Sequence, residues 1–142
     1  MPKHALLIPA DVNQPVQVID LNAGPGELPN LQAAVGGLVD VQAHPEGDLW
    51  CNDSGRICGL PVNVRVGAWM LNQSASAAAG RVGESMVIYG DVVMTGPPDR
   101  NGDTTPISQT MIDYFAGLVV SADALRDWDI RSVDVTVADW DI

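Results

Sequence analysis

The sequence predicts one small α+β domain, built on a mixed or mainly antiparallel sheet of about five to six strands with two to three helices on one side. Three observations predict this class. The chain has 142 residues, a usual size for one domain. Apolar residues make up 46% of it, which is enough for a single core. Short strand-like runs bounded by turn residues alternate with segments of helical spacing.

The first third of the chain predicts a hairpin followed by a helix. Residues 3–10 and 16–21 are apolar runs of strand length, and the turn formers between them favour an antiparallel pair. Pro29 suits the first turn of the next helix, and Gly36-Gly37 suits its end. Four residues lie on one helical face at this spacing: Leu28, Leu31, Ala34 and Val35.

The middle of the chain predicts two hairpins and a second helix. Residues 38–43 alternate apolar and polar side chains, so they favour a strand that turns back into another strand at 48–51. Residues 52–55 read Asn-Asp-Ser-Gly, which suits a tight turn, and we expect the chain to return as a strand through 56–58. Asn63 then suits the N-terminal cap of a helix that runs into the Ala-rich tract.

The last third predicts a central strand, a helix and an acidic end. Residues 85–95 give the strongest strand signal and are placed at the sheet centre, with Gly90 as a bulge or a close approach. After a Pro- and Gly-rich loop, Thr104-Thr105-Pro106 opens a third helix. We assign residues 1–120 to the domain and 121–142 to an acidic C-terminal extension, either a short helix with an edge strand or a mobile tail.

Charge and hydropathy exclude several classes of protein. The chain carries 7 basic and 18 acidic residues, a formal charge of −11, which repels phosphate backbones and anionic lipids. We therefore expect no direct nucleic-acid binding. No apolar run is long enough to span a bilayer, and the first ten residues are too short for the apolar region of a signal peptide, so we expect no membrane association and a cytoplasmic location.

The reactive residue types do not form a catalytic set. Cys51 and Cys58 are expected to be free thiols, because two cysteines without nearby histidines do not complete a zinc site. Cys51 with His44 is a candidate thiol and base, but Cys is as readily a small buried residue. Asp99 opens a calcium-like loop that lacks the required Gly and Glu, so a solvated turn is expected. We predict no catalytic residue, metal or cofactor.

Two groups of residues are candidate binding sites. Asn52, Asn63 and Arg65 offer amides and a guanidinium to a small polar ligand, although a helix cap at Asn63 explains as much. In the acidic extension, two indoles stand among carboxylates, which suits a protein partner with a basic-rimmed pocket. The alternative is that these indoles cover the core. The residues of this second group are Asp127, Trp128, Asp129, Asp139, Trp140 and Asp141.

Several segments together resemble a known family. Residues 31–37 (Leu-Gln-Ala-Ala-Val-Gly-Gly), residues 59–63 (Gly-Leu-Pro-Val-Asn) and residues 88–93 (Ile-Tyr-Gly-Asp-Val-Val) follow the motif order of the domain of unknown function 3846. The resemblance covers about residues 5 to 96. Members of that family occur in bacteriophages, plasmids and bacteria, so the resemblance implies a phage or mobile-element accessory protein. It implies no reaction.

These observations lead to one functional hypothesis with alternatives from other classes. We expect a non-enzymatic protein that binds a host bacterial protein, in host takeover or as an anti-defence factor, through its acidic surface or its C-terminal end. One alternative is an acidic mimic of DNA that inhibits a DNA-binding enzyme, although its charge density is modest. Another is a small ligand- or nucleotide-binding domain or enzyme. A homo-oligomer paired through an edge strand at 133–137 also stays open.

Overall fold

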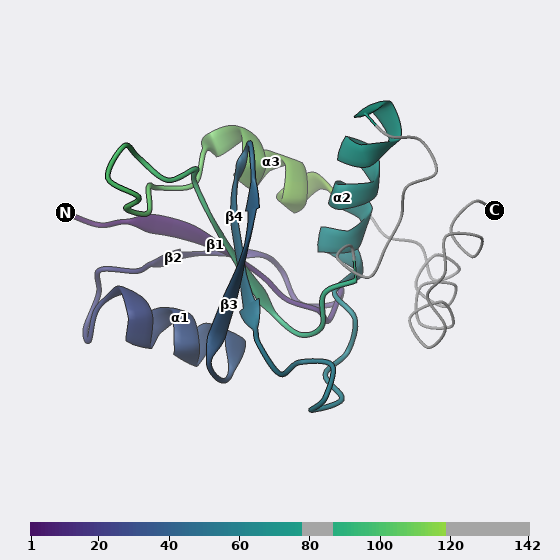
Figure 1. Ribbon diagram of the computed structural model, residues 1–142, viewed down its shortest axis with the longest axis horizontal. Helices are drawn as coiled ribbons and strands as arrows, with labels where there is room; N and C mark the ends of the chain where they lie inside the picture. The colour runs from purple at the N-terminus through teal and green to yellow at the C-terminus, as the bar shows by residue number, and fades with distance from the viewer. Residues whose placement is uncertain (78–86, 119–142) are drawn as a thin grey trace.

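The computed structural model describes residues 1–77 and 87–118, and these form a five-stranded sheet with three helices (Figure 1). The strand order is β2-β1-β5-β4-β3, and every neighbouring pair is antiparallel. The α+β class and the central place of β5 are therefore confirmed. The strands are β1 (His4–Ile8), β2 (Gln17–Asp20), β3 (Val39–His44), β4 (Gly47–Asn52) and β5 (Val92–Thr95).

The helices cover both faces of the sheet, whereas the sequence pattern predicts them on one side. In Figure 1, α1 (Glu27–Val35) lies below the strands and α3 (Gln109–Gly117) above them, while α2 (Val64–Ala77) stands beside α3. The one-sided arrangement was wrong because β1 and β5 are apolar on both faces. A sheet with two apolar faces needs cover on each of them.

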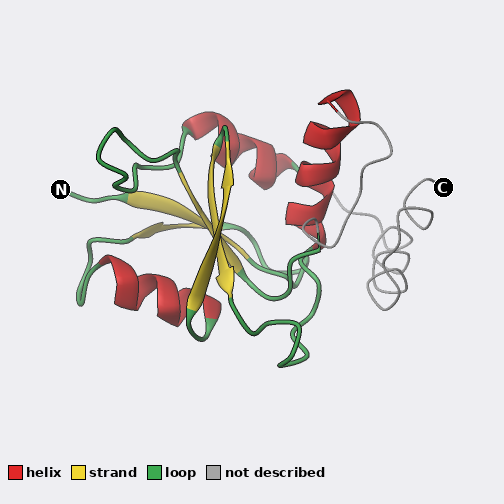
Figure 2. Cartoon of the chain, viewed as in Figure 1, coloured by secondary structure: helices red, strands yellow, loops and turns green. Residues whose placement is uncertain are grey.

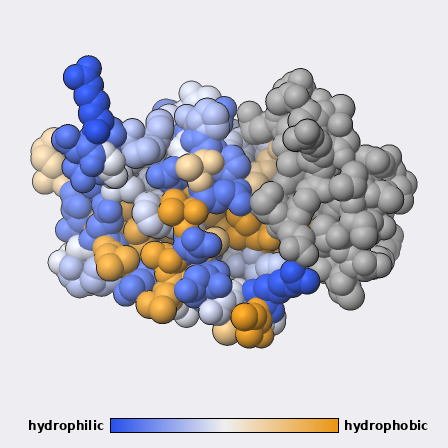
Figure 3. Space-filling view, viewed as in Figure 1, coloured by the Kyte–Doolittle hydropathy of each residue, from blue (hydrophilic) through white to orange (hydrophobic). Residues whose placement is uncertain are grey.

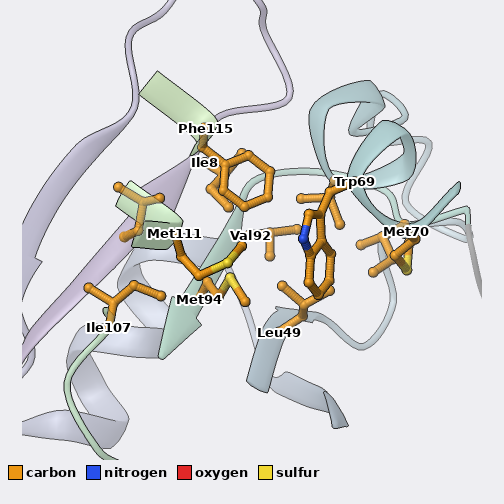
Figure 4. Packing of buried hydrophobic residues seen from close by; sticks show 12 residues of the cluster. Ile8, Leu49, Trp69, Met70, Val92, Met94, Ile107, Met111 and Phe115 are labelled. Carbon is orange, nitrogen blue, oxygen red and sulfur yellow. The ribbon is translucent and has the colours of Figure 1, made fainter. Parts of the chain in front are cut away.

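Alternation along the strands divides the core into two clusters. Leu6 and Ile8 of β1 join the cluster under α2 and α3, which also contains Trp69 and Phe115. Ala5 on the same strand belongs to the other cluster, under α1. Figure 4 shows the first cluster, in which the rings of Trp69 and Phe115 lie 6.2 Å apart between centroids. The period of two in a strand is the reason that one short strand serves both clusters.

The first helix follows the expected pattern except at Leu28. Gly36 ends α1 in the left-handed conformation, with φ of 80°, as the Gly-Gly pair predicts. Leu31 and Val35 are buried against the sheet. Leu28, which shares their face in the sequence pattern, is 53% exposed. It lies in the first turn of the helix, which begins at Glu27.

The predicted strand at 56–58 does not form. Residues 53–59 make a series of turns, in which the amide of Cys58 donates to the carbonyl of Ser54 at 2.8 Å (Figure 2). The reason is topological: β4 is already paired with β3 on one edge and with β5 on the other. No edge of β4 is left for a returning strand.

Two predicted elements begin later than expected. Regular β5 pairing starts at Val92, because Gly90 takes a φ of 88° and lies so close to Leu60 that a Cβ would meet its Cδ1 at 2.8 Å. Helix α3 starts at Gln109 instead of Thr104, with Ser108 as its cap. Residues 104–107 are extended because Thr105 forms a β-bridge with Gly96 and the main-chain amide of Ile107 donates to the main-chain carbonyl of His4.

Asn63 joins three segments at the buried start of α2. Its Oδ1 accepts from the amide of Val66 at 3.1 Å, so the predicted helix cap is confirmed. Its Nδ2 donates to the carbonyl of Ile8 at 2.8 Å and to that of Gly90 at 3.1 Å. The side chain has no exposed surface. One amide therefore fixes α2 to the end of β1 and to the approach of β5.

Replacing Asn63 by Asp tests this junction. Asn63→Asp keeps the shape and the accepting oxygen but removes both donated hydrogen bonds and buries a charge. We expect the free energy of unfolding to fall by roughly 3 kcal/mol or more. The measurement is urea denaturation, with Asn101→Asp at an exposed turn as the matched control. Equal stability of the two variants would contradict the assigned role.

Candidate functional site

The three residues of the predicted polar pocket have separate surroundings. Arg65 is 7% exposed, and its guanidinium donates to the carbonyls of Pro9, Val12 and Gln14 at 2.6–3.1 Å. It therefore ties α2 to the loop between β1 and β2. Asn63 is the buried junction described above. Neither Asn63 nor Arg65 lines the cleft that contains Asn52.

Asn52 lines an open cleft of about 300 Å³ between the β3–β4 hairpin and the segment before β5. Its Nδ2 donates to the carbonyl of Val35 at 3.2 Å, and its Oδ1 accepts from the amide of Ser54 at 2.8 Å. The side-chain amide of Asn52 thus connects the end of α1 with the turn that follows β4. We call this the Asn52 cleft; its other walls include Asp40, Gln42, Cys51, Asp53, Arg56, Ile88 and Tyr89.

The candidate thiol and base are unsuited to nucleophilic catalysis. Burial, together with the charges of Asp40 and Asp53, raises the pKa of Cys51 to about 11, so the thiol stays protonated at neutral pH. His44 pairs with Gly47 next to the turn of the β3–β4 hairpin. Cys51 pairs with Asp40 near the open end of the same hairpin. At the strand rise of about 3.3 Å per residue, their main chains are roughly 13 Å apart. Burial also lowers the pKa of His44.

The calcium-like segment is a self-contained turn. Oδ1 of Asp99 accepts from the amides of Asn101 and Asp103 at 2.8 and 3.0 Å. This carboxylate therefore closes its own loop, as the solvated-turn interpretation predicts. Across residues 1–77 and 87–118, no three His, Cys, Asp or Glu side chains gather as a metal site. In the same ranges no helix has the length and apolarity needed to cross a membrane.

A second cleft opens on the α1 face of the sheet, with a volume of about 390 Å³. We call it the Asp48 cleft. It forms where the start of β4, the first turn of α1 and the loop before α3 meet. It is lined by Lys3, Glu27, Val41, Asp48, Trp50, Gly102, Asp103 and Thr104.

One wall of the Asp48 cleft is an internally neutral network. The ammonium of Lys3 lies 2.9 Å from Oε1 of Glu27, and the hydroxyl of Thr104 donates to Oε2 at 2.6 Å. Burial raises the pKa of Glu27, but the hydrogen bonds from Lys3 and Thr104 and the lysine charge outweigh it, so the net shift is downward. The single lysine of the chain therefore already has its carboxylate partner.

Asp48 supplies an unbalanced charge to the cleft. It is 7% exposed, and its Oδ1 is fully buried with no hydrogen-bond partner in the part of the chain that the structure describes. Burial raises the pKa of this carboxyl, while the charge of His44 across the turn acts in the opposite direction. The indole of Trp50, also on this wall, donates its N–H to the hydroxyl of Thr95 at 3.0 Å.

No sequence pattern indicated this cleft. Asp48 and Trp50 were assigned to a strand at 48–51, and a lone Asp at the start of a strand usually faces water. Lys3, Glu27 and Thr104 are distant in sequence, and no local pattern links them. The one available signal was that Asp48 and Trp50 share a strand face two residues apart. The predicted partner-binding residues from Asp127 to Asp141 lie outside the described residues and stay a prediction.

Cysteine alkylation tests the protonated state of Cys51. At pH 8 a thiol with a pKa of about 11 has on the order of 100-fold less thiolate than one at the reference value of 9.0. Iodoacetamide should therefore modify the exposed Cys58 first and Cys51 far more slowly, as followed by peptide mass spectrometry. In Cys58→Ser the fast phase should disappear. A fast reaction that persists at Cys51 would show an activated thiol.

The stability of Asp48→Asn tests the cost of the buried charge. A carboxyl whose folded pKa is raised destabilises the folded protein above that pKa, and the penalty vanishes below the unfolded value near 3.8. We expect Asp48→Asn to raise the free energy of unfolding by about 1 kcal/mol at pH 7 and not at pH 3. Asp113→Asn, at an exposed site on α3, is the control. A destabilised Asp48→Asn at pH 7 would refute an unbalanced charge.

Comparisons with known proteins identify a family and no activity. The family described as Domain of unknown function (DUF3846) matches residues 3–119. No curated protein and no solved structure gives a significant match. The matched range includes every strand and helix described above, together with both clefts. By this match over most of its length, the chain belongs to the family of the domain of unknown function DUF3846.

Proposed function

We propose that this protein is a non-enzymatic binding module that engages a bacterial protein partner through its acidic surface. Acidic residues outnumber basic ones by 18 to 7, and this excess is the observation that carries the proposal. A surface of one sign attracts partners of the opposite sign and accelerates their association. The expected partner therefore presents Lys and Arg side chains.

The few cations in the described part do little to offset the acidic surface. Lys3 is paired with Glu27, and the guanidinium of Arg65 is buried on main-chain carbonyls. Only Arg56 and Arg100 among the described basic residues are exposed. Among residues 1–77 and 87–118, the exposed carboxylates are Asp11, Asp40, Glu46, Asp53, Asp99, Asp103 and Asp113.

The mixture of side chains on the surface suits a protein partner. Figure 3 shows apolar residues gathered across the middle of one face, with hydrophilic residues around them. Exposed apolar residues in the described ranges include Leu38 at 65%, Val41 at 46% and Ile57 at 89%. An apolar centre with a polar rim is the usual anatomy of a protein interface. The high pKa of Cys51 gives no support to a thiol enzyme.

The biological setting is part of the proposal. The distribution that the family resemblance implies, in bacteriophages, plasmids and bacteria, favours an accessory protein of a phage or mobile element. Such a protein would act in the cytoplasm of the host, in takeover or against a defence system. The acidic C-terminal residues, with Trp128 and Trp140, would add to the same interface.

Affinity capture tests the proposed function. The full chain, immobilised, should retain a defined bacterial protein with an excess of surface Lys and Arg, and added salt should weaken the retention. A variant that combines Asp40→Asn, Glu46→Gln, Asp53→Asn and Asp113→Asn should retain less of it. These four carboxylates are exposed and lie outside the lining of the Asp48 cleft.

An unrelated protein of the same net charge is the control for non-specific attraction. If the chain retains nothing beyond what this control retains, the proposed function is wrong. Competition with duplex DNA separates the alternative: a partner displaced by DNA would favour the DNA-mimic interpretation.

A further inference from the structure

The Asp48 cleft holds a negative charge that the surrounding residues leave unbalanced. Lys3, Glu27 and Thr104 satisfy one another on one wall. On the other wall Asp48 is 7% exposed and has one buried oxygen without a partner among the described residues. A buried carboxylate of this kind costs free energy unless a cation or donors meet it. The cleft thus has the charge of a site for a cation.

The walls indicate what kind of cation fits. A metal ion is disfavoured, because no three ligating side chains gather in the described ranges. Trp50 presents a half-buried indole whose N–H is already bonded to Thr95, so its ring is the part that remains for a ligand. An indole face attracts a flat organic cation, and guanidinium stacks on it better than ammonium does. Val41, 46% exposed, offers apolar surface for a side-chain stem.

We propose that the Asp48 cleft binds the guanidinium group of an arginine side chain presented by a protein partner. The guanidinium would donate to the carboxylate of Asp48 and lie against Trp50, while its methylene stem passes Val41. A peptide source is favoured over free arginine because the α-carboxylate of the free amino acid would face Asp103, whose carboxylate also lines the cleft. This inference rests on the proposed function and names the group that the module recognises.

The cleft differs from an ordinary acidic patch in two respects. First, Asp48 is more than nine-tenths buried, so its charge is poorly screened by solvent and acts strongly at short range. Second, the carboxylate and the indole stand two residues apart on one strand and face the same cavity. An arginine bound there would be fixed by a hydrogen bond and by ring contact together, which gives selectivity for its shape.

The binding of a minimal probe tests the site directly. N-acetyl-L-arginine amide is titrated into the full chain, and the indole N–H resonance of Trp50 is followed by NMR after assignment with Trp50→Phe. We expect a saturable shift with a dissociation constant on the order of 1 mM, as suits one charged group. N-acetyl-L-citrulline amide, a neutral molecule of the same shape, should leave the resonance in place.

Variants separate the cleft from the general acidic field. Asp48→Asn should weaken binding of the arginine probe by roughly 10- to 100-fold, the loss of one charge-assisted hydrogen bond. Asp11→Asn removes one exposed charge outside the cleft lining and should change the affinity by about twofold at most. Equal binding of the citrulline probe, or full affinity in Asp48→Asn, would overturn the proposal. The citrulline comparison uses the unmodified chain and does not depend on the folding of a variant.

The source of the guanidinium and the proposed function are tested separately. Free L-arginine should bind several-fold more weakly than N-acetyl-L-arginine amide. Tighter binding of the free amino acid would contradict the proposal that the guanidinium comes from a protein partner. If the probe fails to bind while the chain still captures a basic partner, the cleft proposal is wrong and the proposed function stands. If the probe binds and no partner is captured, the proposed function is wrong.

Discussion

Burial of the central strand on both faces is the constraint on which the rest of this structure depends. All four residues of β5, Val92 to Thr95, have no exposed surface. Because adjacent residues point to opposite faces, helices must cover both sides of the sheet. Helix α1 covers one side, and α2 with α3 covers the other. The Asn63 junction then holds α2 at the edge of the core.

The same constraint places polar groups on the α1 face. Thr95 ends β5 on this face, and its cross-strand partner in β4 is Asp48. Thr95 is satisfied by the indole of Trp50, but Oδ1 of Asp48 has no partner among the described residues. A strand buried on both sides thus brings a carboxylate into the wall of a cleft. Natural proteins keep such locally unfavourable groups mainly where a function needs them.

Much of the fold follows from local pattern, and the site does not. The β1–β2 and β3–β4 hairpins, the end of α1 at Gly36 and the cap at Asn63 were predictable, because each depends on neighbours in sequence. The strand expected at 56–58 does not form, because both edges of β4 are already paired with β3 and β5. The Asp48 cleft combines residues from four distant segments. Its chemistry depends on the burial of one carboxylate, which no residue pattern along the chain encodes.

The central claim is that Asp48 is a buried, unbalanced carboxylate that an arginine side chain completes. The most direct test is the carboxyl carbon resonance of Asp48, titrated with pH in the free protein and with N-acetyl-L-arginine amide at saturation. The account predicts a pKa above the ordinary value of 3.8 in the free protein and a lower pKa with the probe. If the pKa of Asp48 is at its ordinary value in the free protein and does not change when the probe binds, the claim is contradicted.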